Sequence, residues 1–361
     1  MVEENFTSAL NVMPGIEQPV CVNPYLKAHP RRPKRQLSVD EYVDGILSGN
    51  RVVLSRAITL VESVNPEHFE MAQTIIERCL PHSGKSVRIG ITGVPGVGKS
   101  TFIESFGKML TAEGKRLAVL AIDPSSERSK GSILGDKTRM EELSTDENAF
   151  IRPSPSGLTL GGVARKTRET SILCEAAGFD VIVIETVGVG QSETVVKSMV
   201  DFFLLLMISG AGDELQGIKR GIMEMADSIV ITKADGDNLQ RAELAAAQYR
   251  SALQLFPKNE NGWVVPVDIC SALENRRIDN VWKIIEDFVR LTTDNGWFAH
   301  NRNEQSVKIF YEWIESSLRT RFFAAADVKA TVERLLPSVR NGILSPYQAA
   351  TETLNCYRGH A

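Results

Sequence analysis

The sequence feature that most constrains the fold is the stretch Gly93-Val-Pro-Gly-Val-Gly-Lys-Ser100, which has the pattern G-x-x-x-x-G-K-[S/T]. It directly follows the apolar run 87–92 and directly precedes the amphipathic stretch 101–112. A strand that turns through glycines into a helix points several backbone N–H groups at one place. In this context the pattern predicts a loop that binds phosphate groups, and a glycine-rich turn without a ligand is the less favoured interpretation.

The predicted loop fits a nucleoside triphosphate with its metal ion. Lys99 would bridge the terminal phosphates and act in catalysis, and the Ser100 hydroxyl would bind Mg²⁺. Glycines allow the backbone to approach the dense negative charge closely. The residues expected to bind the nucleotide here are Gly93, Val94, Pro95, Gly96, Val97, Gly98, Lys99, Ser100 and Thr101.

From residue 87 onward, short apolar runs rich in Val and Ile alternate with longer amphipathic stretches. The runs are 87–92, 117–122, 179–184, 202–208, 228–231 and 264–267. Continuous apolar runs are typical of strands that are covered on both faces, and their alternation with helices implies a parallel sheet. The sequence therefore predicts an α/β fold of the P-loop NTPase type, with a mainly parallel central sheet flanked by helices.

The 361 residues divide into four regions of different texture. Residues 1–36 contain five prolines and a basic run without periodicity, which predicts a flexible arm. Residues 37–85 are predicted to form an N-terminal helical extension, and residues 86–300 the P-loop domain. The strands cease beyond residue 300, so residues 301–361 are predicted to form a C-terminal helical arm.

The composition excludes several classes of protein. Hydrophobic residues make up 43% and charged residues 24%, which is typical of a globular chain. The formal charge is −4, so no excess of positive charge indicates a nucleic-acid partner. The longest apolar stretch, 202–208, is far shorter than the roughly 20 residues that span a bilayer, so no membrane partner is expected.

The cysteines and the N-terminus predict a cytoplasmic location. The five cysteines are odd in number and far apart, so neither a disulfide framework nor a zinc knuckle is indicated. The sequence begins Met1-Val-Glu-Glu4, with acids where a targeting signal would carry bases, and no apolar segment follows.

A carboxylate and a glycine follow the apolar run 179–184. Glu185 stands at the expected end of a central strand, where open parallel sheets place their ligands, so we expect it to bind Mg²⁺ and to act in catalysis. The Gly188 amide would donate to the γ-phosphate. The glutamine that usually follows this glycine in GTPases is absent, and Gln191 stands three residues beyond it. The residue that orients the attacking water therefore stays open.

Two short elements after later apolar runs favour guanine over adenine as the base. In Thr232-Lys-Ala-Asp235, the carboxylate of Asp235 can accept hydrogen bonds from the N1–H and the exocyclic amine of guanine, whereas adenine has no N1–H. Lys233 would lay its aliphatic stem along the base. The element Ser271-Ala272-Leu273 would complete the pocket with its backbone. Each element alone is weak evidence for guanine. The preference for guanine rests on the two elements occurring in this order, each after one of two successive strands.

Four longer strings closely resemble the MeaB/ArgK family of P-loop GTPases, over roughly residues 38–358. The strings are Ala121-Ile-Asp-Pro-Ser-Ser126, Gly131-Ser-Ile-Leu-Gly-Asp-Lys-Thr-Arg-Met140, Ile184-Glu-Thr-Val-Gly-Val-Gly-Gln-Ser-Glu193 and Gly212-Asp-Glu-Leu-Gln-Gly-Ile-Lys219. The family consists of GTPase chaperones of the adenosylcobalamin-dependent methylmalonyl-CoA mutase, and it includes the human methylmalonic aciduria type A protein.

The resemblance implies a homodimer formed through the C-terminal arm. Such a protein hydrolyses GTP to GDP and phosphate, binds Mg²⁺, gates adenosylcobalamin delivery to methylmalonyl-CoA mutase and protects that enzyme. A cobalamin adenosyltransferase is a further candidate partner, and binding of cobalamin by this chain itself is not part of the prediction.

The resemblance also assigns roles to residues outside the phosphate loop. Asp123 and Asp136 would lie in the Mg²⁺ and first switch region, Asp136 with a catalytic role and Arg139 close by. Residues 185–191, which include Gln191, would form the second switch. Residues 208–219 would form a third switch, in which Asp213, Gln216 and Lys219 communicate with the partner. Two residues depart from the family pattern, Lys130 in place of Gly and Thr232 in place of Asn.

Two other interpretations remain open. ArgK-type proteins have been described as energising uptake of lysine, arginine and ornithine, which would make this chain a kinase or ATPase associated with transport. Nothing here resembles the signature loop of transporter ATPases. A metal-insertion GTPase for a hydrogenase or urease would call for a His-rich tract or a CxxC pair, and the five histidines are scattered.

Overall fold

The computed structural model describes residues 36–63, 65–122, 140–153, 160–186, 192–210 and 220–357. The chain separates into two units, residues 1–38 and residues 39–361. All helices and strands that the structure describes lie in the second unit, and the four regions expected from the sequence stay predictions as domains.

The strands are β1 (Val87–Gly93), β2 (Leu117–Ile122), β3 (Ala149–Pro153), β4 (Val181–Thr186), β5 (Phe202–Ile208), β6 (Ser228–Thr232) and β7 (Val267–Ile269). The helices before β4 are α1 (Val39–Leu47), α2 (Arg51–Glu62), α3 (Pro66–Cys79), η1 (Leu80–His82), α4 (Lys99–Ala112), α6 (Glu141–Thr145) and α7 (Leu160–Ala176). The later helices are α8 (Ser192–Lys197), α9 (Arg220–Met225), η2 (Gly236–Asn238), α10 (Leu239–Leu253), α11 (Ile278–Asp294), α12 (Trp297–Ala324), α13 (Ala326–Arg340) and α14 (Pro346–Cys356).

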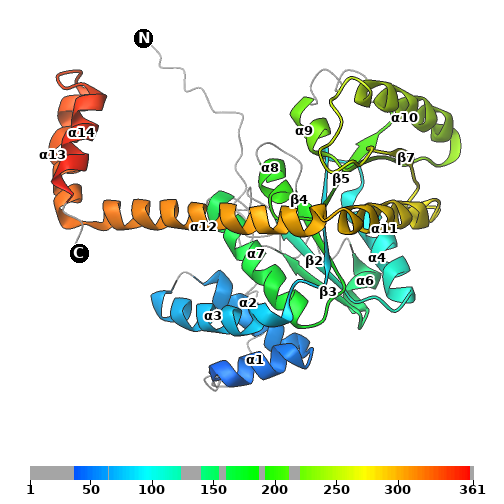
Figure 1. Cartoon of the computed structure of the whole chain (residues 1–361), viewed down its shortest axis with the longest axis horizontal. Helices are drawn as coiled ribbons and strands as arrows, with labels where there is room; N and C mark the ends of the chain where they lie inside the picture. The colour runs from blue at the N-terminus through cyan, green and yellow to red at the C-terminus, as the bar shows by residue number, and fades with distance from the viewer. Residues whose placement is uncertain are drawn as a thin grey trace, which may run out of the picture. The chain divides into compact units, whose positions relative to one another are not determined.

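The described strands form one parallel sheet in the order β3-β2-β4-β1-β5-β6-β7 (Figure 1). β1 lies between β4 and β5, so the loop that follows it opens at the middle of the carboxyl edge. That edge is where open α/β sheets bind their ligands. The predicted α/β fold with a parallel sheet and flanking helices is confirmed.

Two details of the sheet differ from the prediction. β3 was not predicted, because it is a short edge strand that ends at Arg152-Pro153 and pairs only with β2. The strand expected at 264–267 begins only at Val267. Pro266 has no N–H to give to a ladder, and Val264 before it is 85% exposed, so this half of the apolar run lies outside the sheet.

Helices bury both faces of the sheet. On one face α4 and α11 pack Phe102, Phe106, Trp282 and Phe288 against alternate residues of β1, β4 and β5. On the other face α10 packs against β6 and β7, and α7 and α8 contact β4. Because the strands are covered on both sides, their sequences read as continuous apolar runs.

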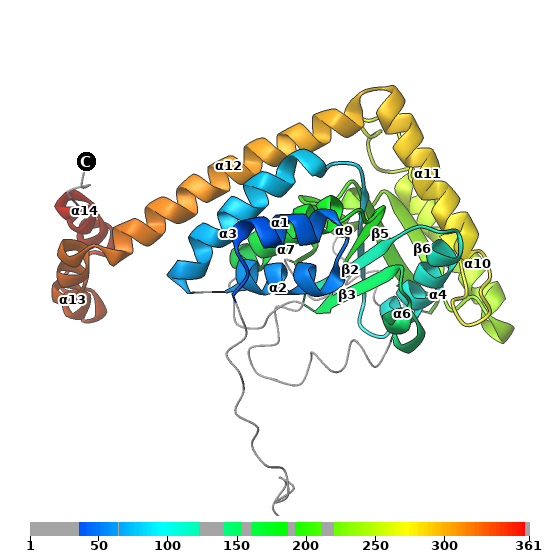
Figure 2. The same ribbon diagram turned by 90° about the horizontal axis from the view of Figure 1, so that it is seen from below.

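The N-terminal helices α1, α2 and α3 pack on one another and on α7, as Figure 2 shows. Their starts follow from capping residues. Asn50 accepts from the N–H groups of Val52 and Val53 at the start of α2, and Asn65 caps α3 ahead of a proline at its first position.

The long helix α12 is anchored at its first turns to the amino edge of the sheet. Arg302 donates to Asp201 and to the carbonyls of Gly84 and Ser86, and Gln305 donates to the carbonyl of Val200. The helices α13 and α14 pack on each other at its far end (Figure 1).

None of the described helices is both long and apolar enough to cross a bilayer. The cytoplasmic location expected from the sequence stays a prediction.

Candidate functional site

The predicted phosphate loop joins β1 to α4 through glycines that no other residue could replace without strain. A Cβ on Gly93 would lie 2.4 Å from the carbonyl oxygen of Leu206 in the neighbouring strand. Gly96 and Gly98 have φ of 79° and 94°, in the left-handed region, and Gly98 is the residue that caps α4. The first N–H groups of α4 therefore open into the loop, which is an arrangement that suits an anion.

Lys99 points back over the loop. Its Nζ donates to the carbonyl oxygens of Gly93 at 2.8 Å and of Val94 at 3.3 Å. Burial lowers the pKa of this ammonium group, and the nearby carboxylates of Glu185 and Glu193 act in the opposite direction. A phosphate group bound at the open N–H groups would stabilise the charged form of Lys99. Its negative charge would therefore raise the pKa of Lys99 again.

Ser100 and Glu185 lie together, as expected for a shared metal ion. The Ser100 hydroxyl donates to Oε1 of Glu185 at 3.3 Å, across the β1–β4 pair in which Ile91 and Glu185 are partners. A hydroxyl and a carboxylate oxygen are the hard ligands that Mg²⁺ takes, so the two residues fit this ion. Among the residues that the structure describes, no group of three His, Cys, Asp or Glu side chains could hold a metal.

Thr232 performs a structural task at the position where the family pattern has Asn. Its buried hydroxyl lies 2.6 Å from the carbonyl oxygen of Val97 and 3.1 Å from that of Met207, and it has one proton to share between them. The contact joins the end of β6 to the phosphate loop. A threonine is therefore sufficient to tie the base loop to the phosphate loop.

The elements expected to recognise the base meet at the ends of β6 and β7. The Ser271 hydroxyl, which is fully buried, donates to Oδ2 of Asp235 at 2.7 Å. Lys233 has φ of 56° and its Nζ donates to the carbonyl of Gly96 at 2.8 Å, so it crosses the phosphate loop. Ala272 is half-buried, and the side chain of Leu273 is 83% exposed.

Several predicted site residues lie outside the described residues. They are Asp123, Lys130, Asp136, Arg139, Gly188, Gln191, Asp213, Gln216 and Lys219. Their assigned roles in the metal site and the three switches stay predictions. The part of the site that the structure brings together therefore consists of the phosphate loop, Glu185 and the two base elements.

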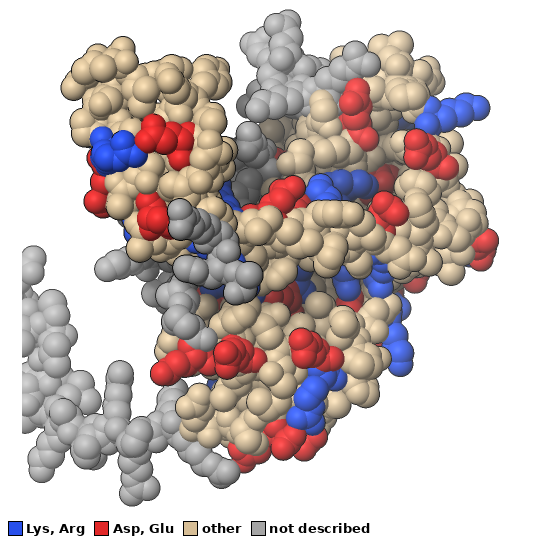
Figure 3. All heavy atoms as spheres, turned by 60° about the vertical axis from the view of Figure 1, so that its left-hand side comes forward, with Lys and Arg blue, Asp and Glu red and all other residues tan. Residues whose placement is uncertain are grey.

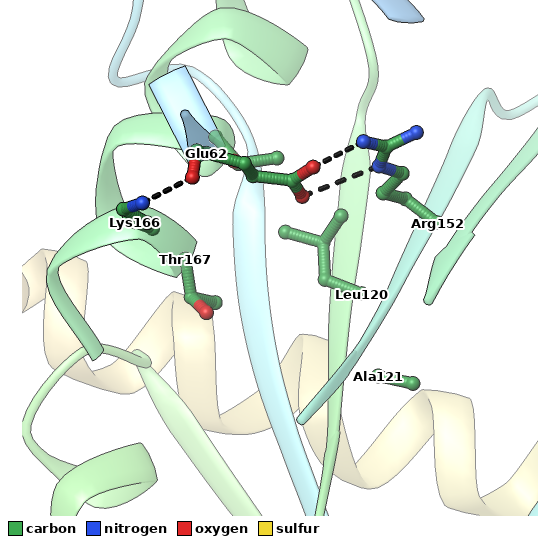
Figure 4. Close-up of a pocket in the computed structure, with 7 residues that line it drawn as sticks. Glu62, Leu120, Ala121, Arg152, Lys166 and Thr167 are labelled. Carbon is green, nitrogen blue, oxygen red and sulfur yellow. Dashed lines mark hydrogen bonds and ion pairs between the residues drawn. The ribbon is translucent and has the colours of Figure 1, made fainter. Parts of the chain in front are cut away.

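A second polar pocket lies beside the end of β2, and Figure 4 shows its lining. Arg152 of β3 pairs with the carboxylate of Glu62 through two nitrogens. The Nζ of Lys166 donates to the main-chain carbonyls of Glu62 and Ser63 at the end of α2, and burial lowers its pKa. Arg152 thus holds α2 against β3, and Lys166 holds the end of α2 against α7, so this pocket is part of the junction with the N-terminal helices.

Sequence reasoning missed two polar residues that hold the base elements in place. Ser105 of α4 donates to the carbonyl of Ala272 at 2.8 Å, and the guanidinium of Arg276 donates to the carbonyl of Ala234. Both bond to main-chain oxygens, which any residue supplies, so no residue spacing could have indicated them.

Comparisons with known proteins identify the family of the chain. Residues 54–327 match the family described as methylmalonyl Co-A mutase-associated GTPase MeaB. A putative GTPase of Caulobacter vibrioides is 52% identical over 318 residues, which are 88% of this chain and 97% of that protein. The methylmalonic aciduria type A homolog, mitochondrial, of Mus musculus is 44% identical over 356 residues, covering 95% of this chain and 86% of that protein.

Among solved structures, the crystal structure of an LAO/AO transport system kinase is 39% identical with a TM-score of 0.72. The match covers 90% of this chain and 99% of that chain.

Proposed function

The chain belongs to the MeaB family of methylmalonyl-CoA mutase-associated GTPases, and on this premise we propose that it is the GTP-driven chaperone of an adenosylcobalamin-dependent methylmalonyl-CoA mutase. GTP hydrolysis itself follows from the family and from relatives described as GTPases. The finer proposal is that hydrolysis gates delivery of adenosylcobalamin to the mutase and protects that enzyme. The observation that carries it is the family match over residues 54–327, which includes the whole phosphate and base site.

The described residues would divide the work of GTP hydrolysis. The N–H groups at the start of α4 would hold the phosphates, and the Lys99 ammonium group would neutralise charge that develops between the β- and γ-phosphates. Ser100 and Glu185 would hold Mg²⁺, which supplies charge neutralisation on the phosphate oxygens.

A co-purification experiment with methylmalonyl-CoA mutase tests the chaperone role. The full chain would be immobilised and exposed to the purified mutase with GTP, with GDP or without nucleotide. We expect the retained amount of mutase to depend on the nucleotide. We also expect GTP turnover to rise when the mutase is added, because a partner protein can supply groups that complete a GTPase site whose intrinsic turnover is slow. A cobalamin adenosyltransferase, the further candidate partner, would be run in parallel.

The Lys99→Ala variant serves as the matched control, since it should lose the stimulated turnover. If the mutase is neither retained in any nucleotide state nor able to change turnover, the chaperone proposal is wrong. If a different B12-dependent mutase is retained instead, the chaperone mechanism still applies and only the identity of the partner changes.

Base specificity gives a separate prediction through Asp235. In Asp235→Asn the side chain can accept from N1–H and donate to the C2 oxygen of xanthine, but it can no longer accept from the C2 amine of guanine. We expect GDP affinity to fall roughly 100-fold, the equivalent of about one charge-assisted hydrogen bond, and XDP to bind better than GDP. Competition binding measures both. Asp237→Asn, two residues away and exposed, should leave the preference for GDP unchanged.

A role in transport is the second candidate, because one solved structure similar to this chain is that of an LAO/AO transport system kinase. An ATP-dependent energiser would need a site that accepts adenine. The hydrogen bond between Ser271 and Asp235 fixes a carboxylate acceptor at the end of β6, which favours guanine. Displacement of bound GDP by ATP as effectively as by GTP would support the transport role and contradict the guanine assignment.

The proposal includes a homodimer that forms through α12, α13 and α14. Four apolar residues of α12 follow one another at spacings of four, three and four, which places them on one helix face: Val307, Tyr311, Ile314 and Leu318. They are 37–60% exposed. Gln305 and Glu312, which contact the GTPase domain, lie on the opposite face of the same helix.

Figure 3 supports this assignment, because the lobe at its upper left, formed by α13 and α14, is mostly uncharged. Ile343, Tyr347 and Leu354 add exposed apolar side chains there. A second copy of this chain would cover such a surface, since contiguous exposed apolar area marks interaction sites.

A further inference from the structure

Beyond the residues that contact the base in the proposed function, we propose that Arg276 and Ser105 are positioning residues for guanine. They hold the hairpin of residues 271–276, named here the base hairpin, against two other parts of the site. This inference rests on the proposed function, because it concerns the base that the same site would bind. It adds two residues that would determine specificity without contacting the nucleotide.

Arg276 joins the base hairpin to the loop that carries Asp235. Its backbone exchanges two hydrogen bonds with Ser271, at 3.0 and 2.9 Å, and its guanidinium donates to the carbonyl of Ala234. Ala234 directly precedes Asp235, and its own N–H donates to the carbonyl of Cys270. Arg276 therefore adds to the ties that fix the distance between the carboxylate that would accept from guanine and the backbone that would complete the pocket.

Ser105 joins the base hairpin to the phosphate-loop helix. It lies on α4, and its hydroxyl donates to the carbonyl of Ala272 at 2.8 Å. The peptide groups on either side of Ala272 are the ones expected to face the base. Ser105 therefore sets the hairpin against the same helix whose first turn would hold the phosphates.

The shape of the base hairpin is one that its neighbours must enforce. Asn275 and Arg277 both have positive φ, at 51° and 60°, which costs free energy for residues other than glycine. Glu274 N–H is satisfied by the hydroxyl of Ser271, and Arg277 pairs with the buried carboxylate of Asp268. A hairpin held in this way offers a fixed pocket wall, so loosening either tether should reduce discrimination between bases more than phosphate binding.

The experiment compares GDP with IDP, whose base lacks the C2 amine that Asp235 would contact. Affinities are measured by competition for the full-length chain and for Arg276→Gln, Arg276→Lys and Ser105→Ala. We expect Arg276→Gln to lower the preference for GDP over IDP about tenfold, and Ser105→Ala about fivefold. The KM for GTP should rise while kcat stays the same. Arg276→Lys keeps one charged donor and should restore part of the preference.

Two control variants lose similar groups elsewhere. Arg290→Gln removes an exposed ion pair with Asp287 on α11, and Ser251→Ala removes a hydroxyl that bonds within its own helix α10. Both should keep the wild-type preference.

The outcomes separate three possibilities. If Arg276→Gln and Ser105→Ala weaken GDP and IDP equally, or lower only the melting temperature, the residues are structural and the inference is wrong. ADP is measured on the wild-type chain as well, and if that chain does not prefer GDP over ADP, the guanine assignment itself fails. In the double variant Asp235→Asn with Arg276→Gln, the second change should reduce the GDP over IDP ratio no further, because its effect passes through Asp235.

Discussion

GTP turnover by the Lys99→Ala variant should fall at least about 100-fold, as expected when a charged group aimed at developing phosphate charge is removed. Lys99 is held over the phosphate loop by the carbonyls of Gly93 and Val94, and burial lowers its pKa. The alanine variant leaves the helix and the glycines in place, so the loss should come from the missing charge. Phosphate release from GTP measures it directly.

Lys108→Ala is the matched control, because Lys108 lies on the same helix and pairs at the surface with Glu142. Its turnover should equal that of the wild-type chain. A folded Lys99→Ala protein with normal turnover would mean that the GTPase reaction does not take place at this loop.

Two aspartates on the apolar face of α12 should convert the proposed dimer into a monomer. In Tyr311→Asp with Leu318→Asp, each new carboxylate would have to be buried without a partner in the proposed interface. We expect the dimer dissociation constant to rise at least about 100-fold, with nucleotide binding unchanged. Light scattering at several concentrations measures the mass. Deletion of the chain beyond residue 301 should also give a monomer, but it removes the anchors Arg302 and Gln305.

Ser316→Asp with Thr320→Asp adds the same charge on the opposite side of α12, where both side chains are exposed. This control should remain a dimer. A Tyr311→Asp, Leu318→Asp protein of dimeric mass would assign the interface to another surface.

The sequence predicted the parallel sheet well because its strands are covered on both faces. The runs at β2, β4 and β5 stand out as continuous apolar segments bounded by charged residues or glycine. The sequence did not predict β3, because this edge strand has only three apolar residues before Arg152-Pro153 and so forms no long apolar run. At β7 the run of apolar residues was real, but Pro266 placed the pairing after it and not within it.

The candidate site divides in a similar way. Lys99, Ser100 and Asp235 belong to motifs in which residue type and spacing follow from the ligand's chemistry. Ser105 and Arg276 bond to main-chain oxygens, and only the folded chain brings those oxygens near them. Thr232 departs from the family pattern, but the sequence does not predict its contact with the carbonyl of Val97. That contact exists only because the fold brings the end of β6 next to the phosphate loop.

The helix α12 is anchored at Arg302 and Gln305 and is held again at Trp313, which stacks on Phe69 of α3, so the part beyond Trp313 can act as a lever. Beyond Trp313 the helix continues for about 16 Å, so a rotation of about 10° there would carry its far end by about 3 Å. The anchor bonds to Val200 and Asp201, which follow α8 and lead directly into β5. In a symmetric dimer both levers would turn together. A sub-ångström shift beside the sheet would thus be read out as a change in the separation of two whole GTPase domains.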